Sequence, residues 1–326
     1  MNIALNPVVD LAAHRTAIDP AAAFYHDVVT GLRRPQKRLP SKYFYDQRGA
    51  QLFDLISRTP EHYATRVESA LLRKHGEEMA ALMGPRTQII EFGGGSGART
   101  RLLLRAAQDV VSYVGVDMSR ECMEDTVTEL ECTFPEMRLE SLWADFTQPF
   151  AAPRSGRAKR RIGFFPGSSI GAFVPNEAED FLNNAARTLG RGGALIVGVD
   201  LKKDRHVLEA SYNDAAGATS AFNLNLLTRI NRDLNGTFDI DAFTHSAHYN
   251  AAAGRVEMHH YSLGFQSARV GAQIFSFSTG ESIHTENAYK YSVAEFQALA
   301  EGCGFTPVKV WTDENNFFSL HFLSVS

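Results

Sequence analysis

The stretch that decides the fold runs from Gln88 to Thr100 and has the sequence QIIEFGGGSGART. An apolar run ends at Glu91, a turn of four glycines and one serine follows over Gly93–Gly97, and Ala98–Ala107 places leucines on one side of a predicted helix. Glycines let the main chain turn sharply and approach a ligand, and the N-terminus of the next helix offers unpaired N–H groups. This order predicts a parallel α/β sheet with a binding site at the turn.

Alternating strands and helices continue after this turn. The predicted strands cover residues 88–92, 110–116, 138–143, 161–165 and 193–200, and two more cover 305–311 and 317–324. A capping box of Ser292 and Glu295 opens the helix between the two groups. Repeated strand–helix units predict a parallel sheet with helices on both faces and with ligands beyond the carboxyl ends of its strands. The last two strands predict an antiparallel pair that closes a seven-stranded sheet.

Two further regions flank or interrupt this sheet. Residues 1–87 show mainly helical patterns and predict an N-terminal helical cap. The strand–helix alternation stops within 202–290, where a helical pattern over 204–235 precedes segments that alternate like antiparallel strands. These alternating segments are 243–250, 256–265 and 269–278. We therefore expect an inserted α+β lobe, with the sheet core formed by 88–201 and 291–326.

Composition places the chain among ordinary globular proteins. Of 326 residues, 44% are apolar and 21% charged, and the formal net charge of −4 gives no reason to expect a nucleic-acid partner. The three cysteines show no C-x-x-C pairing, which argues against a zinc site or a disulfide framework and fits a reducing compartment. No apolar stretch approaches membrane-spanning length. We expect a cytoplasmic monomer that acts on a small molecule and has no membrane partner.

The glycine turn fits two cofactor templates. Residues 93–98 follow the dinucleotide pattern G-x-G-x-x-A, and residues 91–97 follow the pattern E-x-G-x-G-x-G of proteins that use S-adenosylmethionine (SAM) to transfer methyl groups. Both templates place an acid at the end of the second strand, where Asp117 stands. The closing antiparallel pair is usual in methyltransferases and uncommon in dinucleotide dehydrogenases, so it favours SAM.

Four residues at strand ends are candidates for binding this cofactor. Asp117 would hold the ribose hydroxyls. Asp145 ends the third strand and would meet the adenine amino group, while Phe146 could stack on the ring. Glu91 has two possible partners, a backbone amide of the glycine turn or the amine of the cofactor.

Methyl transfer from a sulfonium needs an aligned and desolvated nucleophile and does not require a metal. The chain contains histidine pairs that suggest a metal site, namely His245 with His248 and His259 with His260. Adjacent residues of an alternating strand point to opposite faces of the sheet. We therefore expect no metal ligands.

Several longer runs resemble one family. They are LPSKYFYDQRGAQLFDLISRTPEHYATRVESALL, EFGGGSGARTRLLL, FFPGSSIGAF, GVDLKKDRHVLEASYNDAAGATSAFNLNLLTRINRDL and HTENAYKYS. Together they are similar to the histidine-specific Nα-methyltransferases, which supply trimethylhistidine for ergothioneine biosynthesis. The resemblance implies a class I SAM-dependent methyltransferase core of Rossmann-like fold with a substrate lobe inserted after the fifth strand. It also implies up to three methyl transfers to an amino-acid α-amine.

The resemblance also implies roles for individual residues. The cofactor would be bound by Glu91, Gly93, Gly95, Gly97, Arg99, Asp117, Asp145 and Phe146. The substrate would be bound by His62, Gly167, Ala172, Tyr212, Met258, Glu286 and Ala288. Tyr45 would lie beside the reacting centre, and together with Tyr212 and Glu286 it would orient the amine and the imidazole.

The chain departs from the family pattern at four of these positions. The family has lysine at Arg99, tyrosine at His62, asparagine at Ala172 and serine at Ala288. Each of the last three changes removes or relocates a hydrogen-bonding group, so a paralogue that methylates another amine or a modified amino acid is an alternative. Two further alternatives are an NAD(P)-dependent oxidoreductase and a SAM-binding sensor without catalytic activity.

Overall fold

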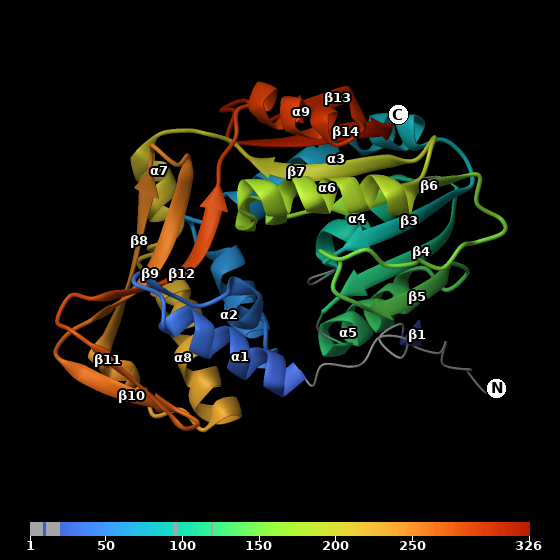
Figure 1. The fold of residues 1–326 in the computed structure, drawn as a ribbon. Coiled ribbons are helices and arrows are strands. Elements are labelled where there is room, and N and C mark those ends of the chain that lie inside the picture. The colour runs from blue at the N-terminus through green and yellow to red at the C-terminus, as the bar shows by residue number, and fades with distance from the viewer. Residues whose placement is uncertain (1–8, 11–19, 94–96, 108, 119) are drawn as a thin grey trace. The chain divides into compact units, whose positions relative to one another are not determined.

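The computed structural model describes residues 9–10, 20–93, 97–107, 109–118 and 120–326 (Figure 1). The chain forms two compact units, which are described separately. The first comprises Met1–Arg15, Ala64–Lys202 and Lys290–Ser326, and the second comprises Thr16–Tyr63 and Lys203–Tyr289. The helices expected as one N-terminal cap divide between them, since α3 (Ala64–Met83) belongs to the first unit and α1 (Pro20–Leu32) and α2 (Gln47–Arg58) belong to the second.

The first unit is built on one sheet with the strand order β1-β5-β4-β3-β6-β7-β14-β13. Its parallel strands are β3 (Thr87–Phe92), β4 (Val110–Asp117), β5 (Arg138–Trp143), β6 (Arg160–Phe165) and β7 (Ala194–Asp200). The antiparallel pair β13 (Phe305–Thr312) and β14 (Phe318–Val325) closes the sheet beside β7. All seven predicted strands are confirmed. An additional strand, β1 (Val9–Asp10), pairs in parallel with β5.

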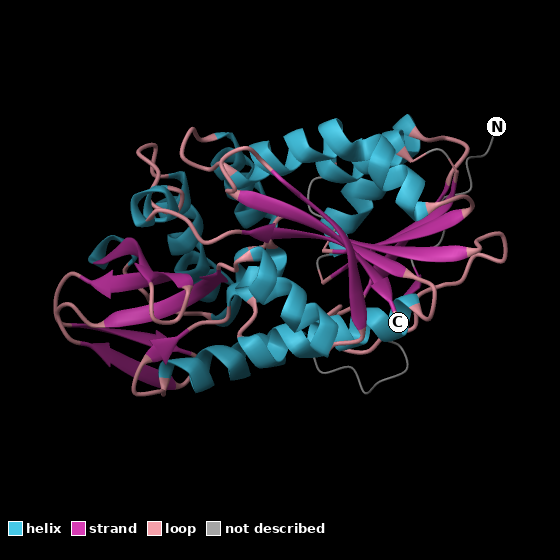
Figure 2. Ribbon diagram, turned by 90° about the horizontal axis from the view of Figure 1, so that it is seen from above, coloured by secondary structure: helices cyan, strands magenta, loops and turns pink. Residues whose placement is uncertain are grey.

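Helices cover both faces of this sheet (Figure 2). They are α3, α4 (Ala98–Ala106), α5 (Arg120–Thr133), α6 (Pro175–Leu189) and α9 (Val293–Gly302). Every residue of β3 is buried, as expected for a central parallel strand. Ile89 packs in one cluster with Leu103 of α4, whereas its neighbour Ile90 packs in another with Phe181 of α6. The buried strand β3 therefore contributes apolar side chains to two cores, one on each face of the sheet.

Local signals fix the ends of two helices. The predicted capping box is confirmed, because Ser292 Oγ accepts a hydrogen bond from Glu295 N at 3.2 Å and Glu295 Oε2 accepts one from Ser292 N at 2.7 Å. Helix α4 begins after Gly97, whose φ of 65° lies in the left-handed region. Among the residues that the structure describes, no helix combines the length and the apolar character that spanning a membrane requires.

The second unit combines helices with two small sheets. A four-stranded sheet has the order β2-β12-β9-β8 and a two-stranded sheet joins β10 to β11. The strands are β2 (Lys37–Arg38), β8 (Phe243–Asn250), β9 (Arg255–Ser262), β10 (Gln266–Val270), β11 (Gln273–Phe277) and β12 (Ser282–Tyr289). The remaining helices are α7 (Arg205–Ala210) and α8 (Ala218–Leu234), with short 3-10 turns at Ser41–Phe44 and Ile240–Ala242. Phe222 and Leu226 of α8 lie in the core.

Two predictions for this unit are wrong. The segment 269–278, expected as one strand, contains the end of β10, a turn and β11, because Gly271 (φ 56°) reverses the chain between the two strands. The helical pattern over 204–235 is interrupted at 211–217, where the Asp214 carboxylate accepts hydrogen bonds from Ala218 N and Thr219 N and starts a new helix. Strand β12 was not predicted.

Candidate active site

The glycine turn follows β3 at the carboxyl edge of the first sheet. Gly93 has φ 72° and donates a hydrogen bond from its N–H to Val116 O at 2.8 Å, which ties the turn to β4. A Cβ at Gly93 would lie 3.5 Å from the Phe146 ring. Gly95, predicted to bind the cofactor, lies outside the described residues. Gly93 therefore brings bare main chain beside an aromatic ring.

Glu91 is fully buried below this turn. Its Oε2 accepts hydrogen bonds from Thr100 Oγ1 and Tyr113 Oη, both at 2.6 Å. Its Oε1 is buried and has no hydrogen-bond partner among the described residues. Burial raises the pKa of Glu91 to about 7 although both hydroxyls lower it. Glu91 thus accepts hydrogen bonds from two hydroxyl groups at Oε2, and its Oε1 is available to accept one from a ligand.

The ends of β4 and β5 carry the next three candidates. Asp117 O accepts a hydrogen bond from Ala144 N at 3.1 Å, which joins the two strand ends. Asp145 is exposed, and its Oδ1 accepts hydrogen bonds from Thr147 N at 3.0 Å and Thr147 Oγ1 at 2.5 Å. Phe146 is half-buried, with its ring centroid 6.0 Å from that of Phe165 in an edge-on contact. The structure therefore places Asp117, Asp145 and Phe146 at one edge of the sheet with Glu91 and Gly93.

Arg99 is held by an acid that sequence reasoning missed. Its Nη1 lies 3.1 Å from Glu68 Oε2. Gly167 N donates hydrogen bonds to both Glu68 oxygens, at 2.9 and 3.0 Å. Burial raises the pKa of Glu68, and the Arg99 charge opposes that rise. Glu68 follows the spacing of the buried Leu71 and Leu72 on α3, and that position on an apolar face is the signal that could have revealed it.

A side chain at Gly167 would strain the backbone and displace the Arg99 guanidinium. Its φ is 80°, and a Cβ there would lie 2.9 Å from Arg99 Nη1. The next residue, Ser168, accepts a hydrogen bond at its Oγ from Asp200 N at 2.8 Å. The 3-10 turn Ser169–Ala172 follows, and Ala172 at its end is half-buried. The loop after β6 is therefore anchored both to α3 and to the end of β7.

Tyr45 and His62 lie around one phenylalanine of the second unit. The Tyr45 ring centroid lies 5.8 Å from that of Phe53, and the His62 ring lies 6.1 Å from Phe53 on an edge-on contact. Tyr45 also contacts Phe222 of α8 at 5.6 Å and remains 43% exposed. The structure therefore brings two residues that are 17 positions apart in sequence to one aromatic cluster.

Three further candidates share one face of the four-stranded sheet. Met258 of β9 lies directly opposite Glu286 of β12, and Ala288 lies opposite Val256. A bulge between His284 and Glu286 shifts the register just before this pair. Met258 and Ala288 are buried, and Glu286 is half-buried. The register, which the sequence did not reveal, groups these side chains.

Tyr212 is positioned through its main chain by a histidine. His245 Nε2 lies 2.8 Å from Tyr212 O, and Asn223 Nδ2 lies 2.8 Å from His245 Nδ1. Burial lowers the pKa of His245. A neutral ring that donates at Nε2 and accepts at Nδ1 satisfies both contacts. His245 is thus a positioning residue for the Tyr212 segment.

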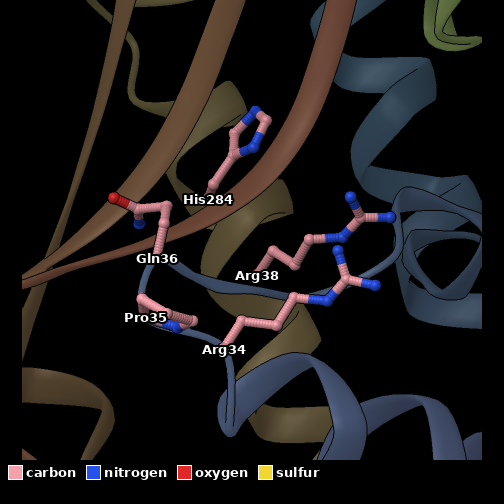
Figure 3. Close-up of a pocket in the computed structure, with 5 residues that line it drawn as sticks. All are labelled: Arg34, Pro35, Gln36, Arg38 and His284. Carbon is pink, nitrogen blue, oxygen red and sulfur yellow. The ribbon is translucent and has the colours of Figure 1, made fainter.

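The second unit has a cavity of about 420 Å³ whose lining includes none of these candidate residues (Figure 3). It is lined by Arg34, Pro35, Gln36, Arg38 and His284. Figure 3 shows the guanidinium groups of Arg34 and Arg38 extending in the same direction. None of its lining residues was predicted to bind cofactor or substrate.

The strand order, the closing antiparallel pair, the glycine turn and the acids after the next two strands define a class I SAM-dependent methyltransferase. Within this class, the chain belongs to the family described as histidine-specific methyltransferase, SAM-dependent, whose model matches residues 24–325. Family membership favours a methyltransferase over the NAD(P)-dependent oxidoreductase.

Named relatives align over most of the chain. A histidine N-alpha-methyltransferase of Mycobacterium tuberculosis is 36% identical over 304 residues, which cover 91% of this chain and 94% of the relative. A protein of the same name from Mycolicibacterium smegmatis is 35% identical, with 96% of this chain and 98% of the relative covered. Ergothioneine biosynthesis protein 1 of Neurospora crassa is 30% identical, with 91% of this chain but only 35% of the relative covered.

Proposed function

We propose that this protein transfers methyl groups from SAM to the α-amine of histidine, up to three times. The observation that carries the proposal is the match to the histidine-specific family over residues 24–325, which extends through both units. The relative from Mycobacterium tuberculosis, named histidine N-alpha-methyltransferase, supports the same substrate at 36% identity.

The residues of the first unit fit SAM as a ligand. When bound, SAM supplies a methyl group on a positively charged sulfur. Glu91 Oε1 is a buried oxygen without a hydrogen-bond partner in the described part of the chain, which suits the ligand's ammonium group. Gly93 leaves free the space beside Phe146 that a Cβ would fill. We assign the ribose to Asp117 and the adenine to Asp145 and Phe146.

Arg99 is assigned to the carboxylate of SAM. Its ion pair with Glu68 fixes the guanidinium, and the planar fork of arginine retains further N–H donors for a second carboxylate. Gly97 starts α4 and is assigned to the cofactor turn together with Gly95. Glu68 would then act as a positioning residue for the cofactor site.

Histidine is assigned chiefly to side chains of the second unit. These are Tyr45, His62, Tyr212, Met258, Glu286 and Ala288. Glu286 would accept a hydrogen bond from the imidazole, and Tyr45 and Tyr212 would orient the amine. The assignment of Gly167 and Ala172 to the amino-acid end rests on the family resemblance.

The reacting amine must carry a free lone pair. Either a local group accepts its proton or the pocket lowers the pKa of the amine, and no residue is assigned as a general base. The rate of the chemical step is therefore expected to rise with pH until the bound amine is deprotonated. A flat profile under conditions where methyl transfer limits the rate would contradict this step.

We further propose that the protein works as a cytoplasmic monomer on this small molecule, without a nucleic-acid partner. Support for a reducing compartment comes from Cys132 and Cys303, which are free. Size-exclusion chromatography with light scattering tests the monomer, and a dimer mass would contradict it.

The test of the activity is an incubation with isotope-labelled SAM and a panel of amino acids and small amines. Mass spectrometry should find label in histidine, as products with one, two and three methyl groups. Label in a different amine and none in histidine would establish the paralogue with a shifted substrate. Calorimetric binding of S-adenosylhomocysteine without any labelled product would instead indicate a sensor.

A further inference from the structure

The four-stranded sheet of the second unit carries a second polar cluster, on the face opposite Met258. Successive strand residues point to opposite faces, so Glu257 and His259 leave β9 on the face that Met258 does not use. His248 of β8 lies directly opposite Glu257 in the register. We call His248, Glu257 and His259 the His–Glu–His cluster.

The cluster places three ligand atoms close together. His248 Nε2 and His259 Nε2 each lie 3.4 Å from Glu257 Oε2, and the three ligand atoms all lie within 4.8 Å of one another. In tetrahedral zinc sites the metal–nitrogen and metal–oxygen bonds of about 2.1 Å put neighbouring ligand atoms about 3.4 Å apart. The spacing from the carboxylate to both imidazoles therefore matches that of ligands around one ion.

The Glu257 carboxylate divides its two oxygens between different partners. Arg255 contacts Oε1 through Nε at 2.7 Å and Nη2 at 2.6 Å, and Asn250 Nδ2 donates to the same oxygen at 3.1 Å. Oε2 faces the two histidines. An outer hydrogen bond that orients a ligating carboxylate is a regular feature of metal sites. By binding Oε1, Arg255 and Asn250 fix the carboxylate so that Oε2 points towards the two histidines and can ligate an ion between them.

The two ring nitrogens of His259 have few hydrogen-bond partners among the described residues. Its ring is nine-tenths buried, its hydrogen bond to Glu257 is 3.4 Å long, and its Nδ1 has no partner among the described residues. Stacking holds the ring in place, with centroids at 5.0 Å from His248 and 4.8 Å from His284.

We propose that the His–Glu–His cluster binds one divalent transition-metal ion of the zinc class through His248 Nε2, Glu257 Oε2 and His259 Nε2. The His248 side chain is 38% exposed, and it provides the route of entry and the side on which water completes the coordination. Two imidazoles and one carboxylate suit zinc, cobalt or nickel, whereas magnesium and calcium prefer oxygen ligands.

Histidines that are adjacent along one strand cannot share a metal ion on one face of the sheet. His259 and His260 do lie on opposite faces, as their separate partners Ser246 and His245 in the β8 register confirm. The proposed ligands instead come from positions two apart on β9 and from the facing residue of β8. Their chemistry is independent of methyl transfer, so the proposal does not rest on the proposed function.

The test is a titration of the full-length chain, free of any affinity tag and stripped with a chelator, with zinc chloride. We expect one equivalent to bind, and His248→Ala or Glu257→Gln to weaken that equivalent by about 100-fold or more, because these residues supply ligand atoms. Cobalt chloride should give the strong visible absorption of tetrahedral cobalt in the wild type and not in these two variants. Magnesium chloride should give no binding isotherm.

The matched control is His75→Ala, because His75 Nδ1 lies 3.7 Å from Glu78 Oε2 on α3. This pair has no third ligand within the described residues, so its loss should leave zinc binding unchanged. The proposal is overturned if the wild type binds no zinc equivalent, or if His248→Ala, with native circular dichroism, retains it. Because His248 is only partly buried, this variant remains informative even if Glu257→Gln fails to fold.

Discussion

The carboxyl edge of the first unit and the four-stranded sheet of the second are organised by different features of the sequence. At the edge, Glu91 is the last residue but one of β3, Asp117 is the last residue of β4, and Asp145 follows β5 by two residues, so the position of each acid follows from the strand to which it belongs. In the second sheet the important neighbours lie across strands, as Met258 lies opposite Glu286. Which residues lie together at the ends of parallel strands can therefore be predicted from spacing, whereas neighbours across antiparallel strands require the register.

Glu68 is the exception at the carboxyl edge, because helix α3 rather than a strand end supplies it. Glu68→Ala would leave the Arg99 charge without its buried partner and Gly167 N without an acceptor. We expect a loss of about 3–5 kcal/mol in the free energy of unfolding, since breaking one half of a buried ion pair is costly. Urea unfolding followed by circular dichroism measures it.

The control is Glu77→Ala, an exposed glutamate on the same helix. This change should alter the unfolding free energy by less than about 0.5 kcal/mol. Equal effects of the two substitutions would show that the Glu68 pair contributes nothing beyond helix propensity.

The buried carboxyl group of Glu91 at the carboxyl edge should make the free energy of unfolding depend on pH. The folded-state pKa of about 7 exceeds the ordinary value of 4.5, so between these values the folded protein binds more protons than the unfolded chain. The free energy of unfolding should therefore fall as pH rises through this window and level off above it. The expected fall is about 3 kcal/mol, because each pKa unit corresponds to about 1.4 kcal/mol.

Glu91→Gln removes this titration while keeping an oxygen for Thr100 and Tyr113. The difference in unfolding free energy between wild type and variant, measured at several pH values, isolates the contribution of Glu91. Parallel pH profiles of the two proteins would mean that Glu91 titrates normally.

The smallest expected effect concerns the departures from the family pattern. Restoring Ala172→Asn and Ala288→Ser adds two hydrogen-bonding groups, each worth about 1–3 kcal/mol if it meets a polar substrate. We expect the KM for histidine to fall by about tenfold or more in the double variant, as about 1.4 kcal/mol corresponds to a factor of ten. Ala251→Ser, at an exposed turn position, is the control. An efficient wild-type enzyme that gains nothing would show that the alanines are neutral.

The strands and helices of the first unit were largely predictable. Strand β7 has a continuous apolar run, ALIVGV, and helix α9 has its capping box at Ser292. The edge strand β1 was missed because two residues, Val9 and Asp10, carry no periodic pattern. The candidates Glu91, Asp117 and Asp145 could be proposed from the sequence because the residues around them predict where the strands end.

The second unit was less predictable because its turns depend on single side chains. Asp214 starts α8 within what looked like one helix, and Gly271 folds one predicted strand into a hairpin. The positioning role of His245 depends on Tyr212 and Asn223, which lie on other elements. No period of the sequence encodes such contacts.

The central claim is that the glycine turn of the first unit holds SAM. A crystal structure of the protein with S-adenosylhomocysteine and histidine tests it most directly. The claim predicts the adenosine between the carboxylates of Asp117 and Asp145, with the amino-acid end of the ligand towards Glu91 and Arg99. An adenosine bound at any other place on the chain would contradict it.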